Sequence, residues 1–175
     1  YGLLILGFLG GAYLLATFFS APIFGEYSDM YGRKNLLAIS LAGTVFASGI
    51  FVLGLFLKSL PLLFISRIID GITGGNIAVA QAAVADVTTP ENRSKNFGLI
   101  GAAFGLGFIL GPFFGAQLSS PHIFSWFNLS TPFIASAILS LFNLILVLTV
   151  FPETLKNYKE KGHVDFAKSV KNIFR

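Results

Sequence analysis

Cysteine is absent from the 175-residue chain, and histidine occurs only twice. Without thiols the chain can form neither a disulfide nor a thiolate metal site. His122 and His163 lie in separate predicted loops, a spacing that does not suit metal binding. We therefore expect no bound metal, and we expect incidental or structural roles for both histidines.

Charge is also scarce. Charged residues make up 11% of the chain and hydrophobic residues 54%, and the mean hydropathy is +0.77. Residues 35–57 and 96–152 contain no Asp, Glu, Lys or Arg. A soluble domain of this length could not bury so much apolar surface in one core. Since a membrane-spanning helix needs roughly 20 apolar residues, these runs predict a membrane protein.

The apolar runs predict an all-α membrane protein with five transmembrane helices. Membrane β-strands would alternate apolar and polar residues over about ten positions, and no such period is visible. The longest charge-free run must fold back on itself near Pro121 and Trp126, where turn-forming and interfacial residues gather. The predicted spans are at about residues 3–24, 36–57, 61–84, 97–118 and 129–151.

The basic residues predict the orientation of the chain. With five spans, Arg33, Lys34, Arg93, Lys95 and the basic residues of the C-terminal tail all fall on one side of the membrane. An excess of Lys and Arg marks the cytoplasmic side. We therefore expect a multi-pass protein of the cell membrane, inner or plasma, with its basic loops and tail in the cytoplasm. No soluble basic face remains for a nucleic acid.

A short charged segment, Gly-Glu-Tyr-Ser-Asp-Met-Tyr-Gly-Arg-Lys, separates the first two spans at residues 25–34. Its spacing, G-x-x-x-D-x-x-G-R-K, resembles the loop between the second and third helices of major facilitator superfamily transporters. Glycine suits a tight turn, and an Asp can cap the helix that follows. The alternative is an ordinary hairpin whose charges only fix topology. The resemblance implies a conformational latch made of Gly25, Asp29, Gly32, Arg33 and Lys34, with Asp86 as the partner of Arg33.

The third span carries two opposite charges, Arg67 and Asp70. An unpaired charge at that depth costs at least ~2.5 kcal/mol, and residues three apart share one helix face, so the two can neutralise each other. The segment resembles the family's second motif, in which Arg is followed by Gln-Gly, with Asp70 in place of Gln. Two interpretations stay open: a structural ion pair, or a proton-coupling pair that faces a water-filled cavity.

The fourth span contains a ladder of glycines that ends in Gly-Pro. Glycines four apart permit close helix packing, and an internal Pro kinks a helix. The ladder resembles the G-x-x-x-G-P-x-x-G-G motif of the antiporter branches, with Ala116 in place of the last Gly. The resemblance implies antiport, with Gly107, Gly111, Pro112 and Gly115 as the hinge.

The resemblance covers almost the whole chain and also implies its organisation. Residues 1–152 correspond to a partial N-terminal six-helix bundle, helices two to six. Residues 153–175 correspond to the start of the central cytoplasmic linker, either an amphipathic helix on lipid or a disordered segment. Because Tyr1 lies directly inside an apolar run, we expect a first helix and a C-terminal half that are missing here.

The implied function is transport by alternating access, with proton-coupled efflux of small molecules or drugs across the lipid bilayer. The driving force would be a proton gradient, without a cofactor. Candidate substrate-binding residues are Asn76, Gln81 and Phe104. An enzyme is disfavoured because the chain has no phosphate-binding loop and its histidines fall on opposite sides of the membrane. The competing class is a non-transporting scaffold or receptor with the same fold.

Overall fold

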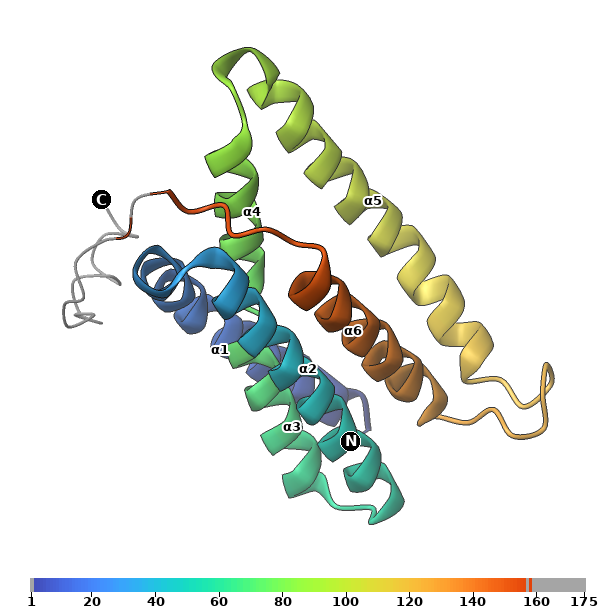
Figure 1. Cartoon of the computed structure of the whole chain (residues 1–175). Helices are drawn as coiled ribbons and strands as arrows, with labels where there is room; N and C mark the ends of the chain where they lie inside the picture. Colours follow the sequence, from blue (N-terminus) through green and yellow to red (C-terminus); the bar gives the residue numbers. More distant parts are fainter. Residues whose placement is uncertain (1, 157, 159–175) are drawn as a thin grey trace.

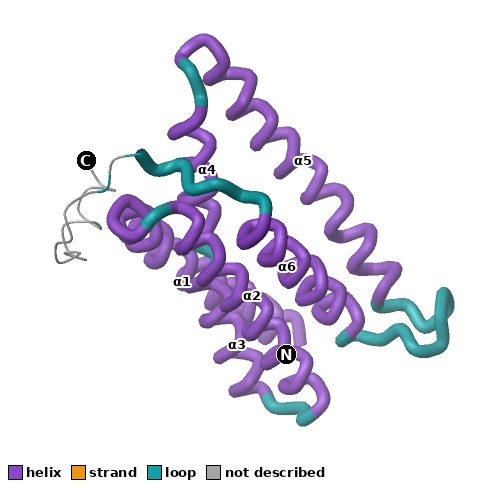
Figure 2. The backbone as a smooth tube through the Cα atoms, viewed as in Figure 1, coloured by secondary structure: helices purple, strands orange, loops and turns teal. Residues whose placement is uncertain are grey.

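The computed structural model describes residues 2–156 and 158. Five of its helical segments are long and apolar enough to cross a membrane, which confirms the predicted all-α, five-span architecture. Figures 1 and 2 show helices joined by loops, of which the one between α5 and α6 is long, with no strand in the described residues. The predicted amphipathic helix of the tail lies outside the described residues. The elements are α1 (Gly2–Tyr31), α2 (Arg33–Phe56), α3 (Leu60–Thr73), α4 (Asn76–Val87), the 3₁₀ turn η1 (Pro90–Asn92), α5 (Arg93–Leu118) and α6 (Thr131–Thr149).

The first charged segment is helical rather than a loop, which corrects the sequence prediction. Helix α1 runs on through Gly25 to Tyr31, and α2 begins at Arg33, so Gly32 is the one residue between them. No proline or further glycine interrupts residues 26–31, and the helix therefore continues. Gly32 has φ +94° and ψ 148°, a conformation that residues with a β carbon strongly avoid.

The third predicted span consists of two helices, α3 and α4, which meet at Gly74 and Gly75. This segment packs closely against α1. A methyl group built at Gly71 would overlap the carbonyl oxygen of Tyr13, and one at Gly75 would lie 3.1 Å from Ser20 Oγ. The Thr17 and Ser20 hydroxyls donate hydrogen bonds of 3.0 and 3.2 Å to the Gly71 carbonyl. Glycine therefore allows the two backbones to approach.

Helices α1, α2, α3, α4 and α6 form the packed part of the molecule. Ser66 of α3 donates a 2.8 Å hydrogen bond to the Ala47 carbonyl of α2. Helix α5 has no buried residue, and Figure 1 shows it set apart from the other helices. The central cluster of buried apolar side chains joins α2, α4 and α6 through Leu36, Leu37, Leu41, Val79 and Val147.

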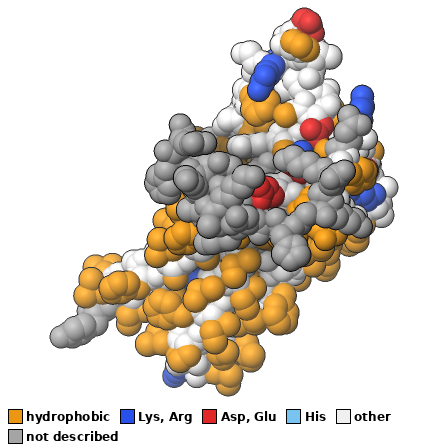
Figure 3. Space-filling model, turned by 90° about the vertical axis from the view of Figure 1, so that its left-hand side faces the viewer, with side chains coloured by type: hydrophobic (Ala, Val, Ile, Leu, Met, Phe, Trp, Pro, Cys, Tyr) orange, Lys and Arg blue, Asp and Glu red, His pale blue; other side chains and the backbone are white. Residues whose placement is uncertain are grey.

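Most of the outer surface is apolar. Leu3, Phe108 and Ile109 are among the large hydrophobic side chains that are fully or mostly exposed. In Figure 3, hydrophobic side chains cover the lower part of the visible face, whereas most of the charged side chains gather toward the upper end. Such a surface is suited to lipid, where exposed apolar side chains cost nothing.

Candidate functional site

A polar cluster closes the charged end of the bundle, and Arg33 lies at its centre. Arg33 is only 6% exposed. Its guanidinium forms ion pairs with Asp29 at 2.6 Å and with Asp86 at 3.0 Å, and it also donates to the Ser28 hydroxyl. Two carboxylates and a hydroxyl therefore surround the buried cation. A buried cation needs such partners to offset its loss of hydration. The terminal cluster consists of Ser28, Asp29, Arg33, Asp86, Glu153 and Thr154.

Glu153 caps the N-terminus of α2, a role that the sequence had suggested for Asp29. One carboxylate oxygen of Glu153 accepts the backbone N–H of Arg33 at 2.9 Å, and the other accepts that of Lys34 at 3.2 Å. A carboxylate at this place accepts hydrogen bonds from free N–H groups and interacts favourably with the helix dipole. Asp29 cannot cap α2 because it lies within α1, one turn before Arg33, and pairs with the arginine side chain instead.

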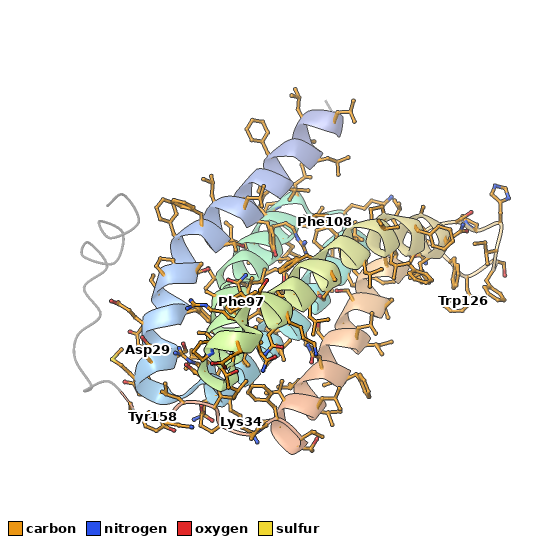
Figure 4. All side chains as sticks on the ribbon, turned by 90° about the horizontal axis from the view of Figure 1, so that it is seen from above. Asp29, Lys34, Phe97, Phe108, Trp126 and Tyr158 are labelled. Atoms are coloured by element: carbon orange, nitrogen blue, oxygen red, sulfur yellow. The ribbon has the colours of Figure 1, made fainter. Side chains whose placement is uncertain are left out.

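The structure brings the expected partners of the latch together. Asp86 of α4 contacts Arg33 as predicted. Thr154 donates to Asp86 at 3.4 Å, so the segment after α6 joins the cluster as well. Gly32 lies against the Glu153 carboxylate, whereas Gly25 faces open space. In Figure 4, Asp29, Lys34 and Tyr158 lie at one side of the bundle, far from Trp126.

Sequence reasoning missed Ser28, Glu153 and Thr154 as members of this cluster. A signal was present in the sequence. Glu153 is the first charged residue after a charge-free run, and with five spans it falls on the same membrane side as Arg33. Its contact with the first two helices could not be read from the chain, because more than a hundred residues separate the partners.

Arg67 and Asp70 form the predicted ion pair on one face of α3. Arg67 Nη1 lies 3.3 Å from Asp70 Oδ2, and the two side chains are 18% and 15% exposed. The Arg67 guanidinium also lies over the ring of Phe51 on α2, 4.5 Å from its centroid, and 5.6 Å from the centroid of Phe133 on α6. The pair thus sits among helices α2, α3 and α6. Its role in proton coupling stays a prediction.

The three candidate substrate residues line one cavity. Asn76, Gln81 and Phe104 face a space of about 370 Å³ between α2, α4, α5 and α6. Asn143 of α6 adds a third amide that the sequence analysis did not single out. An amide side chain within a predicted membrane span was the signal that could have found it. Arg67 and Asp70 are not part of this lining.

The predicted hinge lies on α5, but its glycines do not pack. A methyl group added at Gly107, Gly111 or Gly115 would meet no atom within 4 Å among the described residues. The expectation of close helix packing along this ladder is therefore wrong for the described part of the chain. The other helices do not reach these glycines because α5 stands apart from the bundle. The helix also continues through Pro112 without interruption.

Comparisons with known proteins agree with this architecture. The sequence model of the Major Facilitator Superfamily matches residues 1–174. A class H tetracycline resistance protein from Pasteurella multocida is 41% identical over 152 residues, covering 86% of this chain and 35% of that protein. Major facilitator superfamily domain-containing protein 10 from Mus musculus is 34% identical over 158 residues, covering 90% of this chain and 32% of that protein.

A solved structure has the same fold. The human organic anion transporter MFSD10 (TETRAN) superposes with a TM-score of 0.79 at 29% identity, covering 94% of this chain and 36% of that one. The chain thus spans about a third of the length of the relatives it matches. Members of the matched family are transporters rather than enzymes and sit in the lipid bilayer. With its five apolar helices and a match over nearly its whole length, this chain belongs to the Major Facilitator Superfamily.

Proposed function

We propose that the full-length protein is a secondary transporter that exports small organic molecules in exchange for protons. The observation that carries this proposal is the Arg67–Asp70 pair. Between Lys58 and Asp86 these are the only charged residues, and they lie within helices that can cross the membrane. A carboxylate at such depth is costly even when it is paired, and ionisable residues retained there commonly belong to proton pathways, which supports Asp70 as the proton carrier of an antiporter.

The terminal cluster supports an alternating-access mechanism. The Arg33 side chain joins α2 to α1 and α4 through its ion pairs with Asp29 and Asp86. Glu153 and Thr154 add the segment after α6, by hydrogen bonds with the Arg33 backbone N–H and with Asp86. In this proposal the cluster faces the cytoplasm and holds the protein outward-facing. Opening toward the cytoplasm would separate these partners, and a two-state element of this kind can be biased by protonation or by substrate.

The cavity between α2, α4, α5 and α6 suits a small organic substrate. Its lining is mainly apolar, with amides from Asn76, Gln81 and Asn143 to orient polar groups. The relatives are named for tetracycline resistance and for organic anion transport. We therefore infer that the full-length protein carries small organic molecules that resemble either tetracyclines or organic anions. The proton gradient would drive export without any cofactor.

The test uses full-length protein in liposomes with an imposed pH difference, and tetracycline and a fluorescent organic anion as probes. The wild-type protein should move one of the probes against its gradient. Asp70→Asn should abolish this movement, while Glu91→Gln, the same chemical change at an exposed position, should leave it intact. Absence of flux for both probes in the wild type would favour a scaffold or receptor. Unchanged flux in a well-folded Asp70→Asn variant would remove Asp70 from the mechanism.

A further inference from the structure

Two phenylalanines from different helices lie beside the guanidinium of Arg67. Phe51 of α2 and Phe133 of α6 stack on one another, with ring centroids 4.0 Å apart and planes inclined by 29°. The guanidinium carbon of Arg67, Cζ, lies 4.5 Å from the ring centroid of Phe51 and 5.6 Å from that of Phe133. Phe51 is only 7% exposed, so the first ring is fixed by its surroundings. We call Phe51 and Phe133 the aromatic clamp.

The clamp gives Arg67 a second partner besides Asp70. The face of an aromatic ring attracts a cation, and the attraction is stronger where water is excluded. The rings carry no titratable group, so protonation of Asp70 does not abolish this attraction. Within the described part of the chain, Arg67 Nε is buried and meets no hydrogen-bond acceptor. The rings are therefore neighbours that can stabilise the guanidinium where its Nε forms no hydrogen bond with the described residues.

We propose that Phe51 and Phe133 are positioning residues that hold the Arg67 cation in place when Asp70 takes up its proton. A buried arginine that loses its only counter-ion would be left uncompensated, which is strongly unfavourable. With the clamp present, protonation of Asp70 leaves the guanidinium beside the two rings, and the carboxyl group becomes free to change partners. The inference rests on the proposed proton coupling and adds two residues to it.

The surroundings of Asp70 leave Arg67 as its charged partner. On its own helix Asp70 faces Arg67, and from α2 the Thr44 hydroxyl bonds to it; Thr44 Oγ1 also lies 3.3 Å from Thr73 Oγ1. Helix α1 packs against Gly71 through the carbonyl of Tyr13, its one nearby residue with a titratable side chain. Residues 2–25, 35–56 and 131–149 contain no Asp, Glu, Lys, Arg or His, so these parts of α1, α2 and α6 bring no further charged side chain to Asp70.

The first experiment measures the pH dependence of transport by the full-length protein. Without a clamp ring, Arg67 depends more on an ionised Asp70, so protonation needs more acid. In Phe133→Leu, the pH of half-maximal transport should fall by roughly half a unit to one unit. Phe133→Tyr keeps the ring and should restore the wild-type profile. Phe46→Leu, which removes an exposed ring elsewhere on α2, is the matched control and should change nothing.

The second experiment does not depend on transport. Thermal unfolding of purified full-length protein is measured for Phe133→Leu, Arg67→Met and the double variant, with and without Asp70→Asn. If the clamp exists, the shift of the unfolding midpoint in the double variant should differ from the sum of the shifts in Phe133→Leu and Arg67→Met. This difference should persist when Asp70→Asn is also present. Additive shifts in that background would overturn the inference, as would identical pH profiles for Phe133→Leu and Phe133→Tyr. If the wild type shows no proton-driven flux, the proposed function fails, and the unfolding cycle still decides whether the clamp exists.

Discussion

Two glycine-rich segments of this protein have opposite surroundings. On α3 and the turn after it, Gly71, Gly74 and Gly75 are buried against α1. On α5, the ladder that includes Gly107 and Gly111 meets no neighbour among the described residues, although its spacing is the better match to a helix-packing motif. Glycine spacing therefore tells which face of a helix can be approached closely. Whether another backbone lies there depends on where the neighbouring helices are placed.

The largest effect is expected where a backbone atom lies against the glycine. In Gly71→Ala the new methyl group would overlap the Tyr13 carbonyl oxygen and lie 2.7 Å from the Ala16 β carbon, so α1 and α3 must separate. Overpacking of this kind should lower the free energy of unfolding by about 3 kcal/mol. Thermal or denaturant unfolding in detergent micelles measures the loss. A stability equal to that of the wild type would show that the α1–α3 contact is not tightly packed.

The next effect concerns Gly32, which is required for its backbone conformation and for its neighbour. Gly32→Ala places a β carbon at φ +94° and against the Glu153 carboxylate, so the cap on α2 is displaced. The expected cost is about 2 kcal/mol of unfolding free energy. Gly25→Ala is the control, since Gly25 lies in the helical part of the same segment with open space around it. Equal stabilities of the two variants would contradict the assigned role of Gly32.

Gly75 should show an intermediate effect. A methyl group there would lie 3.1 Å from the Ser20 hydroxyl and 3.1 Å from the Phe24 ring, both side-chain atoms that can move. We therefore expect Gly75→Ala to cost about 1 kcal/mol, less than Gly71→Ala because no backbone atom is in the way. The same unfolding assay compares the two variants. A larger loss for Gly75→Ala would mean that the α1–α4 contact is the more rigid one.

The smallest effect on stability is expected on α5. Gly111→Ala adds a methyl group in open space and improves helix propensity, so the unfolding free energy of this chain should rise by about 0.5 kcal/mol. A hinge role would appear separately, as slower transport by the full-length protein carrying the same change. Destabilisation of the present chain would show that the ladder is covered after all, and unimpaired transport would remove Gly111 from the hinge.

Several features of the site followed from the sequence because they are local. Arg67 and Asp70 are three residues apart on one helix, so their pairing needs only helical geometry. The Arg33–Asp86 contact was implied by the family resemblance and is present. In contrast, the cap from Glu153, the aromatic clamp and the amide of Asn143 each join segments far apart in the chain. Their side chains are ordinary for their positions, and no local pattern marks them as partners.

The amino-acid sequence alone determined that the chain crosses a membrane five times and where its charges lie. Hydrocarbon rejects unpaired backbone groups and charges, so long apolar runs must become helices and charged residues must gather at their ends. The tertiary structure decided which helix faces meet. It placed Glu153 on the N-terminus of α2 and two rings beside Arg67, and within residues 2–156 it brought no neighbour to the glycines of α5. Between apolar helices in lipid the contact partners are chosen by shape and by a few polar bonds, and these depend on all the helices together.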